Sequence, residues 1–194
     1  NQKINLVSRK DIVWFEERHL LHSLAILKTV SFKPGTRILD VGTGGGLPGL
    51  PLAICFPEVS FVLADSIGKK IEAVQSMSQT LDLRNVKAVR SRAEAVDGKF
   101  DFVVSRAVTR LPEFVPWVAD KIKSENRNSL PNGILYLKGG ELSGELQELS
   151  CNHAIYPISV YFDESFFETK HVVHLYGRLR TKSIPSRSGN TNYP

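Results

Sequence analysis

A glycine-rich segment between a short apolar stretch and a helical pattern constrains this chain more than any other feature. The segment, residues 37–49, reads RILDVGTGGGLPG. Its first five residues are short, apolar and bounded by glycines, which predicts a buried strand. Gly42 and Gly44 permit a tight turn, and Gly46 and Gly49 let the next helix approach that strand closely. A strand, a glycine turn and a helix in this order predict a doubly wound sheet that binds a ligand at the turn.

Strand and helix patterns alternate along the rest of the chain. We expect strands over residues 37–41, 60–64, 86–89, 100–104, 134–137, 155–162 and 171–179. We expect helices over residues 11–30, 47–56, 66–81 (with Ser66 as cap), 111–123 and 141–149. Only about eight residues separate the last two strands, too few for a crossover helix, so these strands should pair antiparallel. The pattern predicts an α/β, Rossmann-like, seven-stranded and mostly parallel sheet with one antiparallel C-terminal strand and helices on both faces.

Length and composition set the broad class of protein. The 194 residues, 42% of them hydrophobic, suit one globular domain. We expect this domain to span residues 1–182, with a helical part (1–33) packed on the sheet and a flexible tail at 183–194. The chain begins with Asn, so we expect the helical part to lack its start. Oligomerisation has no evident signal, and we expect a monomer.

Other composition signals narrow the setting. No apolar run approaches the ~18 residues that cross a bilayer, so we expect no membrane partner. Cys55 and Cys151 are too few for a disulfide framework or zinc site, which favours the reducing cytoplasm. His19 and His22 could share a helix face, but no third ligand accompanies them, and we expect no metal. The net charge of +5 permits a polyanionic partner without demonstrating one.

Four interpretations of the glycine turn differ in the ligand, if any, that the turn binds. A mononucleotide phosphate loop is disfavoured, because no Lys-Ser/Thr follows the glycines. The turn could bind NAD(P), could bind S-adenosylmethionine (SAM), or could be structural only. Asp40 favours SAM, since a carboxylate there can meet the ammonium of the methionine moiety but would repel a pyrophosphate. Asp65 ends the second strand and can accept ribose hydroxyls in either cofactor, and Glu94 follows the third strand near the expected adenine edge.

Several short blocks resemble one family in order along residues 1–180. They are residues 5–8 (NLVS), 18–23 (RHLLHS), 40–49 (DVGTGGGLPG), 63–70 (LADSIGKK), 91–94 (SRAE), 105–107 (SRA) and 137–139 (LKG). The family is RsmG, also called GidB, the bacterial small-subunit rRNA methyltransferases. The chain departs from it in a shorter N-terminal helical region and in His22, which stands where the family usually has Asp.

The resemblance implies methyl transfer from SAM to N7 of a guanosine in the 530 loop of 16S rRNA, with the rRNA or the small ribosomal subunit as partner. It implies SAM contacts by Gly42, Leu47, Ala93, Glu94 and Arg106. With the turn and the strand ends, the expected cofactor residues are Asp40, Gly42, Thr43, Gly44, Gly46, Leu47, Asp65, Ser66, Ala93, Glu94 and Arg106.

The chemistry of this reaction limits which residues are needed. Guanine N7 already carries a free lone pair, so we expect no catalytic acid or base and a mechanism of proximity, with N7 about 3–3.5 Å from the methyl group. A cation beside N7 would oppose the developing charge, so Arg106 should hold the SAM carboxylate or a phosphate instead. RNA phosphates should meet cations, for which the candidates are Lys3, Arg9, Lys10, Lys69, Lys70, Arg110 and Lys138.

Other functions stay open on the sequence alone. The main alternative is a SAM-dependent methyltransferase that acts on a small molecule or a protein, although no lid-like insertion is visible between the strands. An NAD(P)-dependent oxidoreductase would need a Tyr-x-x-x-Lys pair near the fourth strand, which is missing there. A non-catalytic RNA-binding module would not need carboxylates at three strand ends.

Overall fold

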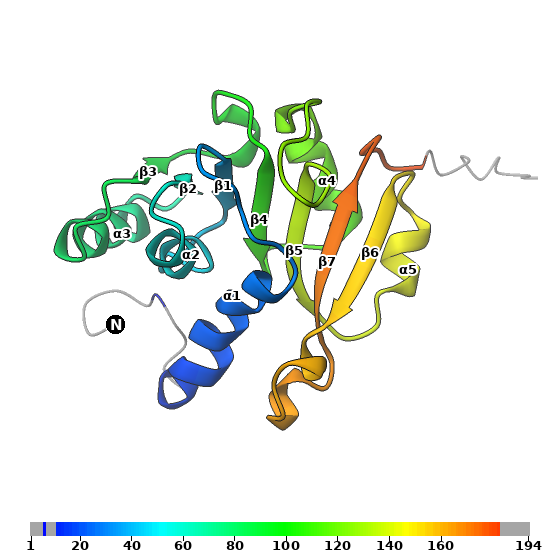
Figure 1. Ribbon diagram of the computed structural model, residues 1–194, viewed down its shortest axis with the longest axis horizontal. Helices are drawn as coiled ribbons and strands as arrows, with labels where there is room; N and C mark the ends of the chain where they lie inside the picture. Colours follow the sequence, from blue (N-terminus) through cyan, green and yellow to red (C-terminus); the bar gives the residue numbers. More distant parts are fainter. Residues whose placement is uncertain (1–5, 7–10, 183–194) are drawn as a thin grey trace, which may run out of the picture.

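The computed structural model describes residue 6 and residues 11–182 and contains a seven-stranded sheet (Figure 1). The strand order is β3-β2-β1-β4-β5-β7-β6. The first five strands run parallel, and β7 is antiparallel to both of its neighbours. The predicted fold class is therefore confirmed. The strands are β1 (Arg37–Val41), β2 (Ser60–Asp65), β3 (Val86–Arg90), β4 (Phe102–Arg106), β5 (Gly133–Gly139), β6 (Asn152–Pro157) and β7 (Lys170–Tyr176).

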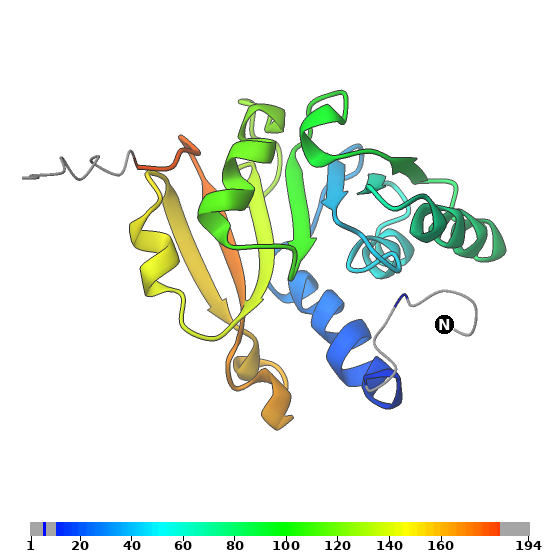
Figure 2. The same ribbon diagram turned by 180° about the vertical axis from the view of Figure 1, so that it is seen from behind.

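Helices cover both faces of the sheet, as the two views in Figures 1 and 2 show. One apolar cluster joins α2 and the N-terminal helical turns to one face, and a second cluster packs α4 and α5 on the other. Burial of these two clusters on opposite faces makes the sheet the central layer. The α-helices of four or more residues are α2 (Gly49–Cys55), α3 (Gly68–Thr80), α4 (Leu111–Val118) and α5 (Ser143–Gln147).

The N-terminal helical region is a chain of unlike turns rather than one regular helix. It consists of η1 (Ile12–Trp14), the π-helical η2 (Phe15–Leu21), α1 (His22–Leu24) and η3 (Ala25–Lys28). Its C-terminal end is anchored in the core, because Ala25 and Ile26 are buried in the first apolar cluster. The run therefore points from the core toward the carboxyl ends of the central strands.

Two predicted elements have different bounds in the structure. Strand β6 covers Asn152–Pro157 and not residues 155–162, since Pro157 has no amide to continue the ladder. The chain then forms the 3-10 turn η6 (Ile158–Val160). Helix α4 includes Pro116 and ends at Val118, short of the predicted residue 123, and the chain continues as the 3-10 turn η5 (Ala119–Lys121).

Two further 3-10 turns lie within residues 11–182: η4 (Ala93–Ala95) and η7 (Ser165–Phe167), which precedes β7. No helix among residues 11–182 is both long and apolar enough to cross a membrane. The predicted tail, residues 183–194, and the predicted RNA contacts Lys3, Arg9 and Lys10 lie outside the described residues.

Candidate active site at the carboxyl ends of the parallel strands

The glycine turn is tied to the neighbouring strand by its backbone. The amides of Gly42 and Thr43 donate to the carbonyl oxygen of Ala64 on β2, at 2.9 and 3.0 Å. Gly42, Gly44 and Gly46 all have positive φ angles, of 68°, 56° and 87°. Because side-chain-bearing residues rarely adopt this conformation, glycines are required for the turn to curl back at the end of β1.

Asp40 braces this turn from beneath and is fully buried. Its Oδ2 accepts hydrogen bonds from the Thr43 hydroxyl at 2.6 Å and from the Gly49 amide at 2.9 Å. Its Oδ1 is buried without a partner. Burial raises the pKa of Asp40 to about 7, against the opposing effect of the two hydrogen bonds and of the Arg106 charge.

Asp65 joins the turn to the start of helix α3. Its Oδ2 accepts from the Gly44 amide at 3.0 Å and its Oδ1 from the Ile67 amide at 2.9 Å. The predicted Ser66 cap is wrong: the N-cap position of α3 is Ile67, and no side chain caps the helix. Asp65 is 7% exposed at the edge of a cavity, so its remaining lone pairs face the space that a ligand would occupy.

A cavity of about 380 Å³ opens beside these carboxylates, and we call it the glycine-loop cavity. The predicted cofactor residues that line it are Gly42, Asp65, Ser66, Ala93, Glu94 and Arg106. The other predicted cofactor residues, which lie in the framework of the turn and do not line the cavity, are Asp40, Thr43, Gly44, Gly46 and Leu47. The structure thus divides the predicted set into a wall and its support.

Sequence reasoning missed part of this wall. Trp117 of α4, which packs with the second apolar cluster, also lines the cavity. Lys70, predicted to meet RNA, also lines it, with Nζ 3.9 Å from Asp65 Oδ2. The buried Lys121 donates from Nζ to the carbonyl oxygens of Glu94 and Val96, both at 2.8 Å, which holds the Glu94 turn in place. None of these contacts has a local sequence signal.

A second cavity of about 420 Å³ adjoins the first and shares Arg106 and Ala107 with it. Its wall also includes Arg18, His19, His22, Tyr136, Lys138, Phe166 and Lys170. Ala107 has a φ of 53°, a conformation that costs energy for a residue with a Cβ. The Tyr136 hydroxyl fixes the adjoining segment, because it accepts from the Val108 and Thr109 amides and donates to the Thr109 carbonyl at 2.9–3.0 Å.

The family profile described as GidB, rRNA small subunit methyltransferase G, matches residues 1–173. The chain belongs to the GidB family. The predicted family is thus confirmed. Ribosomal RNA small subunit methyltransferase G of Flavobacterium johnsoniae is 57% identical over 175 residues, which are 90% of this chain and 83% of that protein. The protein of the same name from Phocaeicola vulgatus is 49% identical over 175 residues, 90% of this chain and 84% of that protein.

Solved structures with little sequence similarity share the fold of this GidB-family chain. A SAM-dependent methyltransferase from Aquifex aeolicus matches with a TM-score of 0.60 at 15% identity, covering 87% of this chain and 98% of that one. A ribosomal protein L11 methylase from Lactobacillus delbrueckii matches with a TM-score of 0.58 at 14% identity, covering 79% and 77%. At these identities the likeness concerns the fold alone. The family, matched over residues 1–173, confirms the predicted enzyme class and cofactor.

The polar and aromatic groups in and behind the wall of the glycine-loop cavity fit SAM. The unpartnered, buried Oδ1 of Asp40 is an acceptor that a nearby cationic group would satisfy. Asp65 and Glu94 supply acceptors for hydroxyl and amino groups, and Trp117 supplies a flat apolar surface. Arg106 supplies a cation whose pKa burial lowers below its usual value, while Asp40 opposes this shift. These are the groups that an amino-acid zwitterion joined to an adenosine requires.

The remaining predicted RNA contacts differ in their availability. Lys69 is exposed at the start of α3. Arg110 forms an ion pair with Glu148 at 2.5 Å, and Lys138 forms one with Glu145 at 2.7 Å. Paired cations can still meet phosphate, but only by exchanging a carboxylate for it. Lys69 is therefore the described candidate best placed for a phosphate.

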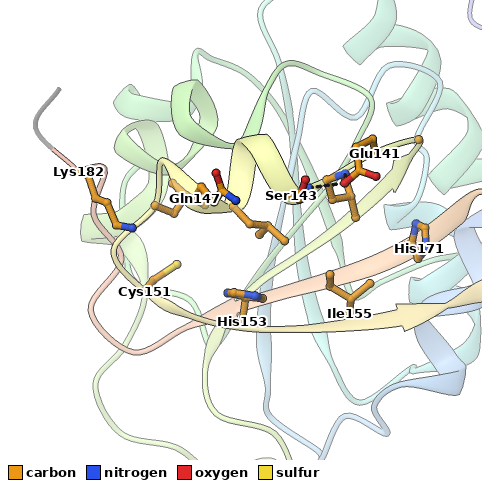
Figure 3. Close-up of a pocket in the computed structure, with 12 residues that line it drawn as sticks. Glu141, Ser143, Gln147, Cys151, His153, Ile155, His171 and Lys182 are labelled. Carbon is orange, nitrogen blue, oxygen red and sulfur yellow. Dashed lines mark hydrogen bonds between the residues drawn. The ribbon is translucent and has the colours of Figure 1, made fainter.

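A third cavity, of about 680 Å³, is larger than the two described above and lies away from the glycine turn (Figure 3). Figure 3 shows His153 and Ile155 of β6 below helix α5, with Gln147 above them. Its wall contains none of the predicted cofactor residues. The residues from 11 to 182 hold no group of three or more metal-ligating side chains here or elsewhere. Volume alone does not make this cavity the active site.

Proposed function

We propose that this chain transfers a methyl group from SAM to N7 of a guanosine in the 530 loop of 16S rRNA. The observation that carries the proposal is the pair of adjoining cavities at the carboxyl ends of the strands, in a chain of the GidB family. One cavity offers acceptors at the positions a SAM site needs. The other gives an acceptor base a place next to it, with Arg106 and Ala107 between the two.

The cofactor would be held by residues at three strand ends. Asp65, at the end of β2, accepts the ribose hydroxyls. Glu94 and Trp117 bind the adenine, one at its polar edge and the other at its face. Arg106, which lines the cavity, meets the carboxylate of the methionine moiety, and Asp40, buried behind the glycine turn, attracts the ammonium from outside the cavity wall. When bound, SAM supplies an electrophilic methyl group, and the residues of the chain supply position and electrostatics.

The reaction at N7 requires placement more than proton transfer. N7 attacks with its own lone pair, so the chain needs no base in contact with it. The polar side chains near the second cavity agree with this: the Tyr136 hydroxyl is committed to backbone groups, and burial raises its pKa. Burial lowers the pKa of His22 to about 3, which keeps that ring neutral beside a base that gains positive charge.

The setting of the reaction follows from the substrate. Ribosomal RNA is the partner, and Lys69 with the N-terminal cations Lys3, Arg9 and Lys10 meets its phosphates. The enzyme acts as a monomer in the cytoplasm, where its substrate is made. Residues 1–182 act as one domain. The paired cations Arg110 and Lys138 exchange Glu148 and Glu145 for phosphate when RNA binds.

Methyl-group incorporation tests this proposal. Purified chain is incubated with methyl-labelled SAM and either deproteinised 16S rRNA or intact 30S subunits, and label is counted separately in RNA and protein. We expect label in RNA only, and loss of most of it with Asp65→Asn. The matched control Asp82→Asn changes an exposed acid outside both cavities and should retain activity. Label in ribosomal protein, or in neither fraction, would refute the proposed substrate.

A further inference from the structure

Two histidines that line the second cavity each have a buried ring nitrogen without a hydrogen-bond partner. His19 and His22 lie three residues apart on the N-terminal helical run, and both line the cavity. The Nε2 atoms of both rings are buried and unpartnered. Since buried polar atoms are almost always hydrogen-bonded, this pair marks a place where a ligand supplies the missing partners.

The contacts of His19 define which of its nitrogens carries the proton. Arg106 Nη1 lies 2.9 Å from His19 Nδ1. A guanidinium can only donate, so Nδ1 is the acceptor and holds a lone pair. Burial and the Arg106 charge both lower the pKa of His19, which favours the neutral ring. A neutral imidazole without a proton on Nδ1 carries it on Nε2, and His19 therefore has an unused N–H donor at Nε2.

His22 has the opposite polarity at the same atom. The ring is 6% exposed and forms a hydrogen bond with the Arg18 backbone that raises its pKa, which is the effect of a ring N–H donating to a carbonyl. Because Nε2 is the unpartnered nitrogen, the donor is Nδ1–H. Burial, Arg106, Lys170 and His19 all oppose protonation. His22 therefore remains neutral and has an unused lone pair on Nε2.

We propose that His19 and His22 determine base specificity by reading one edge of the acceptor guanine, with His19 Nε2–H donating to O6 and His22 Nε2 accepting from N1–H. The inference rests on the proposed function and names the residues that select its substrate. Guanine presents an acceptor at O6 beside a donor at N1, whereas adenine presents a donor beside an acceptor. The pair of rings matches guanine and mismatches adenine at both positions.

The other polar groups of the cavity wall have partners of their own: Arg18 pairs with Asp11 at 3.6 Å, and Arg106 donates to the Arg18 carbonyl oxygen at 3.2 Å. The Tyr136 hydroxyl makes its full set of hydrogen bonds to the 108–109 backbone. Lys138 is paired with Glu145, and Lys170 lies over the ring of Phe166 at 4.8 Å. Two neutral rings also add no positive charge next to a base that becomes cationic at N7. Reading by neutral donors and acceptors is thus compatible with the chemistry.

A cycle of enzyme and substrate changes tests the proposal. The target guanosine in 16S rRNA is replaced by 2-aminopurine, which keeps N7 but lacks O6 and the N1 proton, or by inosine, which keeps both. The wild-type chain should have a kcat/KM about 10- to 100-fold lower on 2-aminopurine RNA, the usual value of a matched donor–acceptor pair. Inosine RNA should be methylated within severalfold of guanosine RNA.

The variants His19→Asn and His22→Asn remove the ε nitrogen and keep a polar atom at the δ position, where the Arg106 and Arg18 contacts lie. Each should reduce kcat/KM on guanosine RNA about tenfold with little change on 2-aminopurine RNA. The control His153→Asn, on β6, should alter neither. Equal losses on both RNAs would overturn the proposal and assign the two rings a structural role. Absence of transfer by the wild type even to guanosine RNA would instead contradict the proposed function.

Discussion

Ionisation of Asp40 should control how cofactor affinity depends on pH. The carboxyl group is fully buried, and this burial raises its pKa to about 7. Thr43 and Gly49 stabilise the ionised form through Oδ2, yet Oδ1 has no partner. A ligand ammonium beside Asp40 favours its ionised form, so binding below pH 7 must release a proton. Affinity should therefore rise as pH rises toward 7.

The size of the effect follows from the fraction of Asp40 that is ionised. With a pKa near 7, that fraction falls roughly 15-fold between pH 7.0 and 5.5, while an α-amino group stays protonated over the same range. The dissociation constant for SAM should increase by the same factor. Asn at position 40 cannot ionise, so Asp40→Asn should bind more weakly at pH 7 and lose most of this dependence.

Calorimetric titration with S-adenosylhomocysteine, which shares the methionine ammonium, measures the affinity and the number of protons released in buffers of different ionisation enthalpy. Asp82→Asn, an exposed change, serves as the matched control and should keep the wild-type slope. If Asp40→Asn shows the same slope as the wild type, Asp40 does not sense the ligand and its role is confined to bracing the turn.

Three further predictions concern the turn and the cations beside it. Gly49→Ala should destabilise the fold by about 1–3 kcal/mol in denaturant titration, because the added Cβ would lie 2.6 Å from Asp40 Oδ2. The control Gly144→Ala, with open space around the added Cβ, should be neutral or stabilising by up to about 1 kcal/mol. Folding raises the pKa of Asp40 from 3.8 to about 7, so the contribution of this group to the free energy of unfolding is full below pH 4 and is lost as pH rises through 7. Over that range the wild type should lose about 4 kcal/mol of unfolding free energy relative to Asp40→Asn. Parallel curves of stability against pH for the two proteins would contradict this. Lys69→Ala should lower the slope of log affinity for RNA against log salt concentration by about 0.7. Lys70→Ala should leave that slope unchanged and weaken SAM binding severalfold, since the Lys70 side chain forms part of the cavity wall. The reverse pattern would exchange the roles of the two lysines.

The fold could be predicted because its signals are local. The central parallel strands are short, mostly apolar stretches, although the edge strand β3 (VKAVR) is not, and the glycine turn requires positive φ angles that few other residues adopt. The antiparallel β7 was predicted from a short connection before it; that connection spans residues 158–169, longer than expected, but contains only the 3-10 turns η6 and η7 and no crossover helix. The bounds of β6 were misplaced because the apolar stretch continues past Pro157, while the hydrogen-bonded ladder cannot.

The candidate site was predicted only where its residues lie near the glycine turn and strand ends. Asp65 and Glu94 could be found because they follow strands, whose carboxyl ends meet at one edge. The second cavity combines residues as distant as Arg18 and Lys170, and Trp117 reaches the first from across a helix. No periodicity reports such long-range packing.

The position of the methyl group on the RNA tests the central claim most directly. After reaction of the wild-type chain with 16S rRNA or 30S subunits, the RNA is reduced with borohydride and cleaved with aniline, which breaks the strand at N7-methylguanosine, and the ends are mapped by primer extension. We predict one new cleavage, at a guanosine in the 530 loop, that depends on SAM and disappears with Asp65→Asn. Methylation at another atom, at several unrelated guanosines, or at an adenosine would contradict the account.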